Sequence, residues 1–119
     1  MKNLLVLFGG VSPEHEVSLR SAEFVLSHID RLKYNVYAVG ITKEGKWKYY
    51  PSQDYAAIRE NHWQEAEGVC DAALSPSRGQ GLLILKPQGL EIVPIHCCFP
   101  VLHGENGEDG SIQGLMQVA

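Results

Sequence analysis

One apolar run, NLLVLF at residues 3–8, constrains the fold of this chain more than any other feature. Gly9 and Gly10 follow it directly and signal a turn. A short continuous apolar run of this kind is typical of a strand buried on both faces, because a strand with one face in water alternates apolar and polar residues. Strands buried on both faces occur in parallel sheets. The run therefore predicts an α/β domain.

A helix and a second strand are expected next. The helix begins either at a Ser12 N-cap followed by proline or nearer Val17, and the second start leaves Glu14 on a loop. Residues 34–41, YNVYAVGI, predict the second strand, and a strand–helix–strand unit is what parallel pairing requires. The apolar face of the helix is expected to hold Val17, Ala22, Val25, Leu26 and Ile29.

The middle of the chain predicts shorter elements. Gly45 marks a small hairpin, and the composition of residues 54–66 favours a short helix. After a loop-like stretch at residues 75–81, apolar segments on both sides of residues 87–89 predict a second hairpin. HCCFPVL, residues 96–102, then predicts another buried strand.

These elements predict one domain over residues 1–119, with a three-layer, Rossmann-like architecture of a mostly parallel sheet and flanking helices. The strands at residues 3–8, 35–41 and 96–102 are expected to be mutually parallel. The loops after the first and the last of them then lie at one edge of the sheet. In open parallel sheets, ligands bind at that edge.

Composition narrows the class of protein further. The chain is 45% hydrophobic and 20% charged, which is ordinary for a globular domain. A net charge of −4 without a basic block argues against nucleic acid and anionic membranes as partners. No apolar run approaches the ~20 residues of a membrane span, and the N-terminal run is shorter than the ~7–15 residues of a signal-peptide core. A cytoplasmic protein is expected.

The cysteines favour the same compartment, because an odd number gives no disulfide framework. Cys97 and Cys98 are neighbours on an expected strand, so their side chains should point to opposite faces. A metal site would recruit them together with His62, Cys70 and His96, but these residues lack metal-ligand spacing. Buried, inert thiols and no metal site are expected.

The last segment, HGENGEDGSIQG at residues 103–114, gathers a histidine, three acids and four glycines. Acids such as Glu108 and Asp109 cap helices and complement the helix dipole, whereas His103 at the end of a strand suits contact with a carboxylate or phosphate. The residues alone leave both interpretations open. The first loop, GGVSPEH, lacks two glycines of the dinucleotide fingerprint, and no Walker A loop is present, which argues against an NAD site.

The string H-G-E-N-G-E-D-G-S-I-Q-G resembles the N-terminal signature of the D-alanine–D-alanine ligases. F-G-G-V-S-P-E-H-E-V-S resembles the opening motif of the same family. The stretch GITKEGKWKYY is similar to the long-form ligases, which include the vancomycin-resistance D-alanine–D-serine and D-alanine–D-lactate enzymes. The resemblance covers essentially the whole chain.

The resemblance implies an N-terminal domain of an ATP-grasp enzyme whose central and C-terminal domains are absent from this chain. It implies ATP and Mg²⁺ (or Mn²⁺) as cofactors of the full-length enzyme, with none bound by this domain alone. The implied partners are D-alanine and a second copy in a homodimer. In the family, ATP phosphorylates the carboxylate of one D-alanine, a second D-alanine attacks through its amine, and the dipeptide enters peptidoglycan synthesis.

The resemblance also assigns residues. Glu14 matches the glutamate that binds the ammonium of the first D-alanine, and His103 matches the histidine near the substrate carboxylate and the transferred phosphate. These two are the expected catalytic residues, and Ser18 and Gly104 complete the expected substrate-binding set. Ser18 and Glu16 are also expected to orient the loop and the start of the helix.

Two other functions remain open from the sequence. Another ATP-grasp relative, of the biotin carboxylase or glutathione synthetase kind, would share the fold without the H-G-x-x-G-E-D-G string. A non-catalytic binding or dimerisation module belongs to a different class. The second substrate, whether D-alanine, D-serine or D-lactate, is chosen in the family by a loop that this sequence does not contain.

Overall fold

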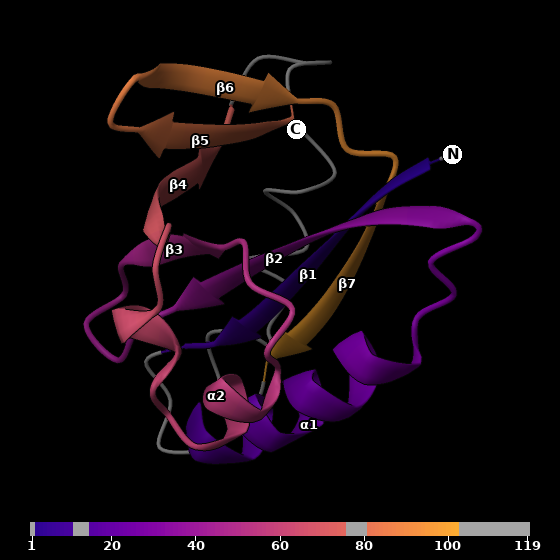
Figure 1. The fold of residues 1–119 in the computed structure, drawn as a ribbon, viewed down its shortest axis with the longest axis vertical. Helices are drawn as coiled ribbons and strands as arrows, with labels where there is room; N and C mark the ends of the chain where they lie inside the picture. Colours follow the sequence, from indigo (N-terminus) through magenta and orange to yellow (C-terminus); the bar gives the residue numbers. More distant parts are fainter. Residues whose placement is uncertain (1, 11–14, 76–80, 103–119) are drawn as a thin grey trace.

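A computed structural model describes residues 2–10, 15–75 and 81–102. This part of the chain forms one sheet of seven strands, in the order β6-β5-β4-β3-β2-β1-β7 (Figure 1). The elements are β1 (Lys2–Gly9), α1 (His15–His28), β2 (Tyr34–Ile41), β3 (Trp47–Tyr50), α2 (Ala56–Arg59), the 3-10 helix η1 (Trp63–Glu65), β4 (Cys70–Leu74), β5 (Leu82–Lys86), β6 (Gly89–Val93) and β7 (Cys97–Leu102).

Three strands at one end of the strand order, β2, β1 and β7, are parallel, as the sequence predicts. β1 pairs in parallel with β2 on one side and with β7 on the other, so that Val6 lies between Ala38 and Phe99. Helix α1 makes the crossover between β1 and β2. The expected parallel set of three strands and the α/β class are therefore confirmed.

The sheet as a whole is mixed, and the prediction of a mostly parallel sheet is wrong for the described strands. The pairs β2–β3, β3–β4, β4–β5 and β5–β6 are all antiparallel. Short turns join β2 to β3 and β5 to β6, whereas a parallel pair requires a crossover of about a dozen residues or more. The two expected hairpins exist, but they extend the main sheet.

Strand β1 is buried on both faces, as its apolar run predicts. Leu4, Val6 and Phe8 pack against the helices, and Leu5 and Leu7 pack on the opposite face. Burial of side chains of this size stabilises the fold by about 1.5–3 kcal/mol each.

Helices α1 and α2 cover the same face of the sheet (Figure 1). The opposite face is covered by strands, because residues of β4, β5 and β6 pack with Leu5 and Leu7. The three-layer prediction places helices on both faces of the sheet. Among the described residues, helices cover only one face. The helix that Glu108 and Asp109 would cap lies outside the described residues.

Helix α1 is described from His15 onward, so the Ser12 alternative for its start lies outside the described residues. Val17, predicted to face the core, is 40% exposed. The buried stripe repeats every three or four residues but runs one position away from Val17, and it consists of His15, Ser18, Leu19, Ala22 and Leu26.

The short helix expected in residues 54–66 is present in two pieces. Asn61 has a φ of 63°, and this left-handed residue separates α2 from η1. The break turns Trp63 into the core, where it is fully buried.

Candidate functional site

The carboxyl ends of the three parallel strands meet at one edge. In the sheet register Gly9 lies between Ile41 of β2 and Leu102 of β7. The chain therefore leaves β1 and β7 at neighbouring points. This is the edge at which open α/β sheets bind ligands.

A glycine turn follows β1 at this edge. Gly9 and Gly10 have φ values of 87° and 108°, and the Gly10 N–H donates to the carbonyl oxygen of Ile41 over 2.8 Å. A Cβ at Gly9 would lie 2.3 Å from the same carbonyl oxygen. Both the left-handed backbone and the close approach require glycine here.

Ser18 joins α1 to the two strands. Its buried hydroxyl accepts a hydrogen bond from the Gly9 N–H at 2.8 Å and donates one to the carbonyl oxygen of Val101. The hydroxyl is thus held between β1 and β7, as expected for a residue that orients the loop. A contact of Ser18 with substrate stays a prediction.

His15 is a residue that the sequence analysis did not single out. It is 1% exposed, and its Nδ1 lies 2.6 Å from the carbonyl oxygen of Gly10. The family resemblance assigns roles to Glu14, Glu16 and Ser18 but none to His15, so it gives no signal for this residue. The helical spacing does, because His15 shares the buried face of α1 with Ser18 and Ala22.

Glu16 points to the surface at the same end of α1. Its carboxylate lies 3.8 Å from Nζ of Lys43, with the Glu16 side chain 72% exposed. An exposed pair of this kind contributes about 0–1 kcal/mol. The pair connects the start of α1 to the turn after β2.

The other expected site residues, Glu14, His103 and Gly104, lie outside the described residues. Their nearest described neighbours in sequence are His15 and Leu102, at the ends of α1 and β7. The roles of these three residues remain predictions.

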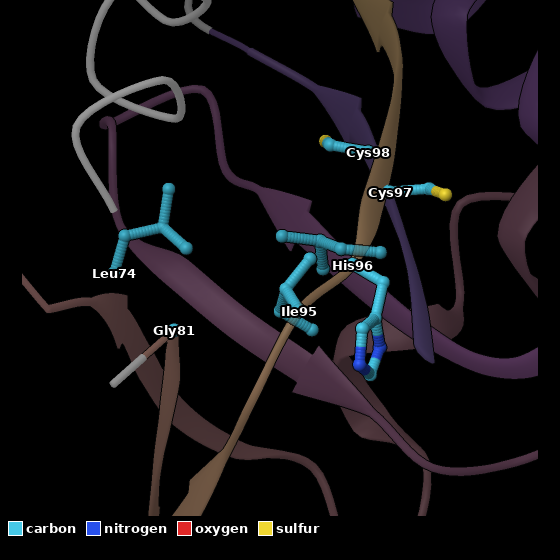
Figure 2. A pocket seen from close by; sticks show the side chains of 7 residues that line it. Leu74, Gly81, Ile95, His96, Cys97 and Cys98 are labelled. Carbon is cyan, nitrogen blue, oxygen red and sulfur yellow. The ribbon is translucent and has the colours of Figure 1, made fainter. Parts of the chain in front are cut away.

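A pocket of about 90 Å³ lies elsewhere, on the face of the sheet opposite to the helices (Figure 2). Its lining includes Leu5 and Cys98, and the ring of His96 beside it accepts a hydrogen bond from the Asn3 N–H at Nδ1 over 2.9 Å. The full lining is Leu5, Leu74, Gly81, Ile95, His96, Cys97 and Cys98.

The cysteines are only partly buried, so the prediction of buried thiols is wrong in this respect, whereas the predicted orientation of Cys97 and Cys98 is confirmed. Cys97 pairs with Leu4 and Cys98 with Leu5, so the two side chains point to opposite faces of the sheet (Figure 2). Burial raises the pKa of Cys98 to about 12, which keeps it a neutral thiol at neutral pH. Within residues 2–10, 15–75 and 81–102, no group of three or more His, Cys, Asp or Glu side chains is arranged to hold a metal ion.

Neither α1 nor α2 is long and apolar enough to cross a membrane, and the described residues contain no other α-helix.

The geometry defines an α/β domain in which a glycine turn and the first turn of a helix stand at the carboxyl ends of parallel strands. Residues 3–119 match the family model described as the D-ala D-ala ligase N-terminus. The chain belongs to the D-alanine–D-alanine ligase family, as an N-terminal domain of that family.

Individual relatives agree. The chain is 44% identical over 117 residues to a D-alanine–D-alanine ligase of Thermoanaerobacter sp. (strain X514), which covers 98% of this chain and 32% of that protein. The chain is also 44% identical, over 118 residues, to the vancomycin C-type resistance protein VanC1 of Enterococcus gallinarum. That alignment covers 99% of this chain and 32% of VanC1.

Among solved structures, the VanG D-Ala:D-Ser ligase from Enterococcus faecalis superimposes with a TM-score of 0.90 at 38% identity, over 99% of this chain and 34% of that one. The D-alanine–D-alanine ligase from Coxiella burnetii gives a TM-score of 0.80 at 26% identity, over the same shares of the two chains. The chain thus spans about a third of the length of these relatives.

Proposed function

We propose that this chain is the N-terminal, substrate-binding domain of an ATP-dependent D-alanine–D-alanine ligase. One observation carries the proposal: the loops that bear the two family motifs leave neighbouring parallel strands, because Gly9 and Leu102 are register partners. Family membership over residues 3–119 supports it. The remaining two thirds of the protein would form the ATP-grasp domains.

In the proposed reaction, the γ-phosphoryl group of ATP passes to the carboxylate of the first D-alanine and ADP leaves. The amine of the second D-alanine attacks the acyl phosphate, loses a proton and displaces inorganic phosphate, which leaves the dipeptide. Mg²⁺ or Mn²⁺ would neutralise the charge of the phosphates when bound. We place ATP and the metal ion in the part of the protein that follows this chain.

The residues of this domain would bind and orient the first substrate. Glu14 would accept a charge-assisted hydrogen bond from the ammonium of the first D-alanine, a contact worth about 1.5–3 kcal/mol. His103 would stabilise the negative charge that develops at the carbonyl oxygen of the acyl phosphate as the amine attacks, with Gly104 allowing close backbone approach. Ser18 would act through the backbone of the glycine turn, which it holds.

We also propose that the full-length enzyme is a cytoplasmic homodimer that supplies a peptidoglycan precursor. The three cysteines, none of which forms a disulfide in the described part of the chain, support the compartment. The dimer rests on the family resemblance.

A D-alanine–D-serine ligase is the second candidate. The superposition on VanG supports it, and the identity to VanC1 equals that to the Thermoanaerobacter ligase. The relatives therefore do not identify the second substrate, and an experiment must decide it.

The test uses the full-length protein that contains this chain. Phosphate release is measured with Mg-ATP and D-alanine alone, and then with D-serine or D-lactate added, while mass spectrometry identifies the product. D-alanyl-D-alanine from D-alanine alone is the expected result. A mixed product with D-serine would favour the second candidate. If phosphate release does not depend on D-alanine, the protein is not a ligase, and the chain would be a non-catalytic module.

A further inference from the structure

The structure defines which ring nitrogen of His15 carries a proton. Its Nδ1 lies 2.6 Å from the carbonyl oxygen of Gly10, and a carbonyl oxygen only accepts hydrogen bonds. The proton must therefore sit on Nδ1. On the other side of the ring, Nε2 is buried and has no hydrogen-bond partner among the described residues.

The ring also packs against the first glycine of the turn. A Cβ built at Gly9 would lie 3.0 Å from Cε1 of His15, which places the ring directly beside that residue. His15 thus contacts Gly9 with its ring edge and Gly10 with its Nδ1–H. Because His15 belongs to α1, it fastens the turn to the helix.

Three residues from two elements, β2 and α1, hold this turn. Ile41 of β2 accepts from the Gly10 N–H, Ser18 of α1 accepts from the Gly9 N–H, and His15 donates to the Gly10 carbonyl. Of the three, His15 is the side chain that immediately follows Glu14 in sequence. A change at this residue would weaken the contact between α1 and the glycine turn.

We propose that His15 is a positioning residue for first-substrate binding, and that it acts through the Nδ1–H donor. The proposal rests on the proposed ligase function. It names a residue outside the expected site set and a chemical requirement, a donor at the Nδ1 position, that burial alone would not impose.

Two substitutions separate the donor role from simple packing. The amide nitrogen of asparagine reaches about the position of Nδ1, whereas that of glutamine reaches about the position of Nε2. Glutamine fills more of the space of the ring. A donor role therefore predicts that His15→Asn is the better replacement, and a packing role predicts that His15→Gln is.

The experiment compares both variants in the full-length enzyme. We expect His15→Gln to raise the KM for the first D-alanine about tenfold, the effect of losing one hydrogen bond, and His15→Asn to raise it less than about threefold. The KM for ATP should stay unchanged in both. Equal or better binding by His15→Gln, or a parallel rise in the KM for ATP, would overturn the positioning role.

His28 offers a matched control. It lies at the other end of α1, and its Nδ1 makes the same kind of contact, 2.7 Å from the carbonyl oxygen of Phe24, but at an exposed position. His28→Ala should leave the KM for the first D-alanine at its wild-type value. A rise equal to that of His15→Gln would show a general effect of helix stability.

A measurement on the wild-type protein avoids any folding defect in the variants. With ¹⁵N-labelled histidine, the imidazole signals of His15 should show a protonated Nδ1, and an unprotonated Nδ1 would overturn the proposal. Failure of the ligase function and failure of the role of His15 give different results. A wild-type enzyme that forms no dipeptide contradicts the ligase function, whereas an active enzyme in which glutamine replaces His15 without loss contradicts only the role of His15.

Discussion

Trp63 packs its indole ring directly onto Gly40, in the parallel part of the sheet. A Cβ at Gly40 would lie 2.3 Å from Cη2 and 2.5 Å from Cζ3 of Trp63. The same indole makes an edge contact with Phe8, with ring centroids 5.0 Å apart. Gly40 does not have a positive φ, so glycine is needed here for space. The contact fastens η1, outside the sheet, to the centre of the core.

The first prediction follows from this contact. Gly40→Ala should lower the free energy of unfolding by about 1–3 kcal/mol, because the added methyl group overpacks the core. Trp63→Phe removes the atoms of the indole that the methyl group meets. In urea unfolding, the double variant should lose less stability than the sum of the two single variants, by about 0.5–3 kcal/mol. Additive losses would show that the contact does not limit residue 40.

A second prediction concerns Ser18. Ser18→Ala should lower the free energy of unfolding by about 2–4 kcal/mol, since the buried Gly9 N–H and Val101 carbonyl both lose their partner. Ser27→Ala, at an exposed position of the same helix, is the control and should change stability by less than about 0.5 kcal/mol. If the two variants unfold at the same urea concentration, the hydroxyl of Ser18 does not hold the glycine turn.

The third prediction is a dependence of stability on pH. Burial raises the pKa of Cys98 to about 12 from an ordinary value of 9.0. As the pH rises above 9, the thiol ionises first in the unfolded chain, which then binds fewer protons than the folded one, and stability falls. Between pH 8 and pH 10 the wild type should lose about 1 kcal/mol more than Cys98→Ala in urea unfolding. Equal losses in the two proteins would mean that the folded-state pKa is not raised.

The sequence predicts the parallel part of this sheet well and its antiparallel part poorly. The run at residues 3–8 and the strand–helix–strand unit follow from local periodicity, and both are present. How the hairpins associate with the sheet is not a local property. Tyr49 of β3 pairs with Cys70 of the neighbouring strand β4, and nothing in the sequence around either residue indicates that partner.

The candidate site shows the same division. Motif resemblance indicated Ser18, and the structure gives it buried contacts to β1 and β7. His15 was missed because its importance comes from a contact with Gly10 that only the folded turn creates. Val17 was assigned to the core because periodicity defines a stripe but not its exact edge.

A fourth prediction tests the proposed roles in the full-length enzyme. Glu14→Gln should raise the KM for the first D-alanine and lower turnover while the KM for ATP stays nearly unchanged, because the amide keeps the shape of the carboxylate but loses its charge. Removing one charge-assisted hydrogen bond corresponds to a loss of about tenfold to a hundredfold in kcat/KM. An unaltered KM for the first D-alanine would count against Glu14.

His103→Ala should act differently in the same assays. It should lower kcat more than it raises KM, because its contact strengthens as negative charge develops in the transition state. A rise in KM with an unchanged kcat would reassign His103 to ground-state binding.

The last prediction is that the 119-residue chain alone folds but is catalytically inactive. Folding rests on the two buried faces of β1 and the packing of α1, which close a core of ordinary size. Inactivity rests on the motifs, which contain no Walker-type phosphate loop and no lysine to neutralise the phosphates of ATP. The proposed residues supply one wall of a site, and one wall leaves a small ligand largely in water.

Circular dichroism should show a cooperative melt, and calorimetric titration with Mg-ATP or D-alanine should be flat at millimolar concentration, with the full-length protein as the positive control. Exposed apolar side chains such as Phe24, at 65%, should also make the chain self-associate as its concentration rises. Saturable ATP binding by the isolated chain would place the nucleotide site within these 119 residues and contradict its assignment to the rest of the enzyme.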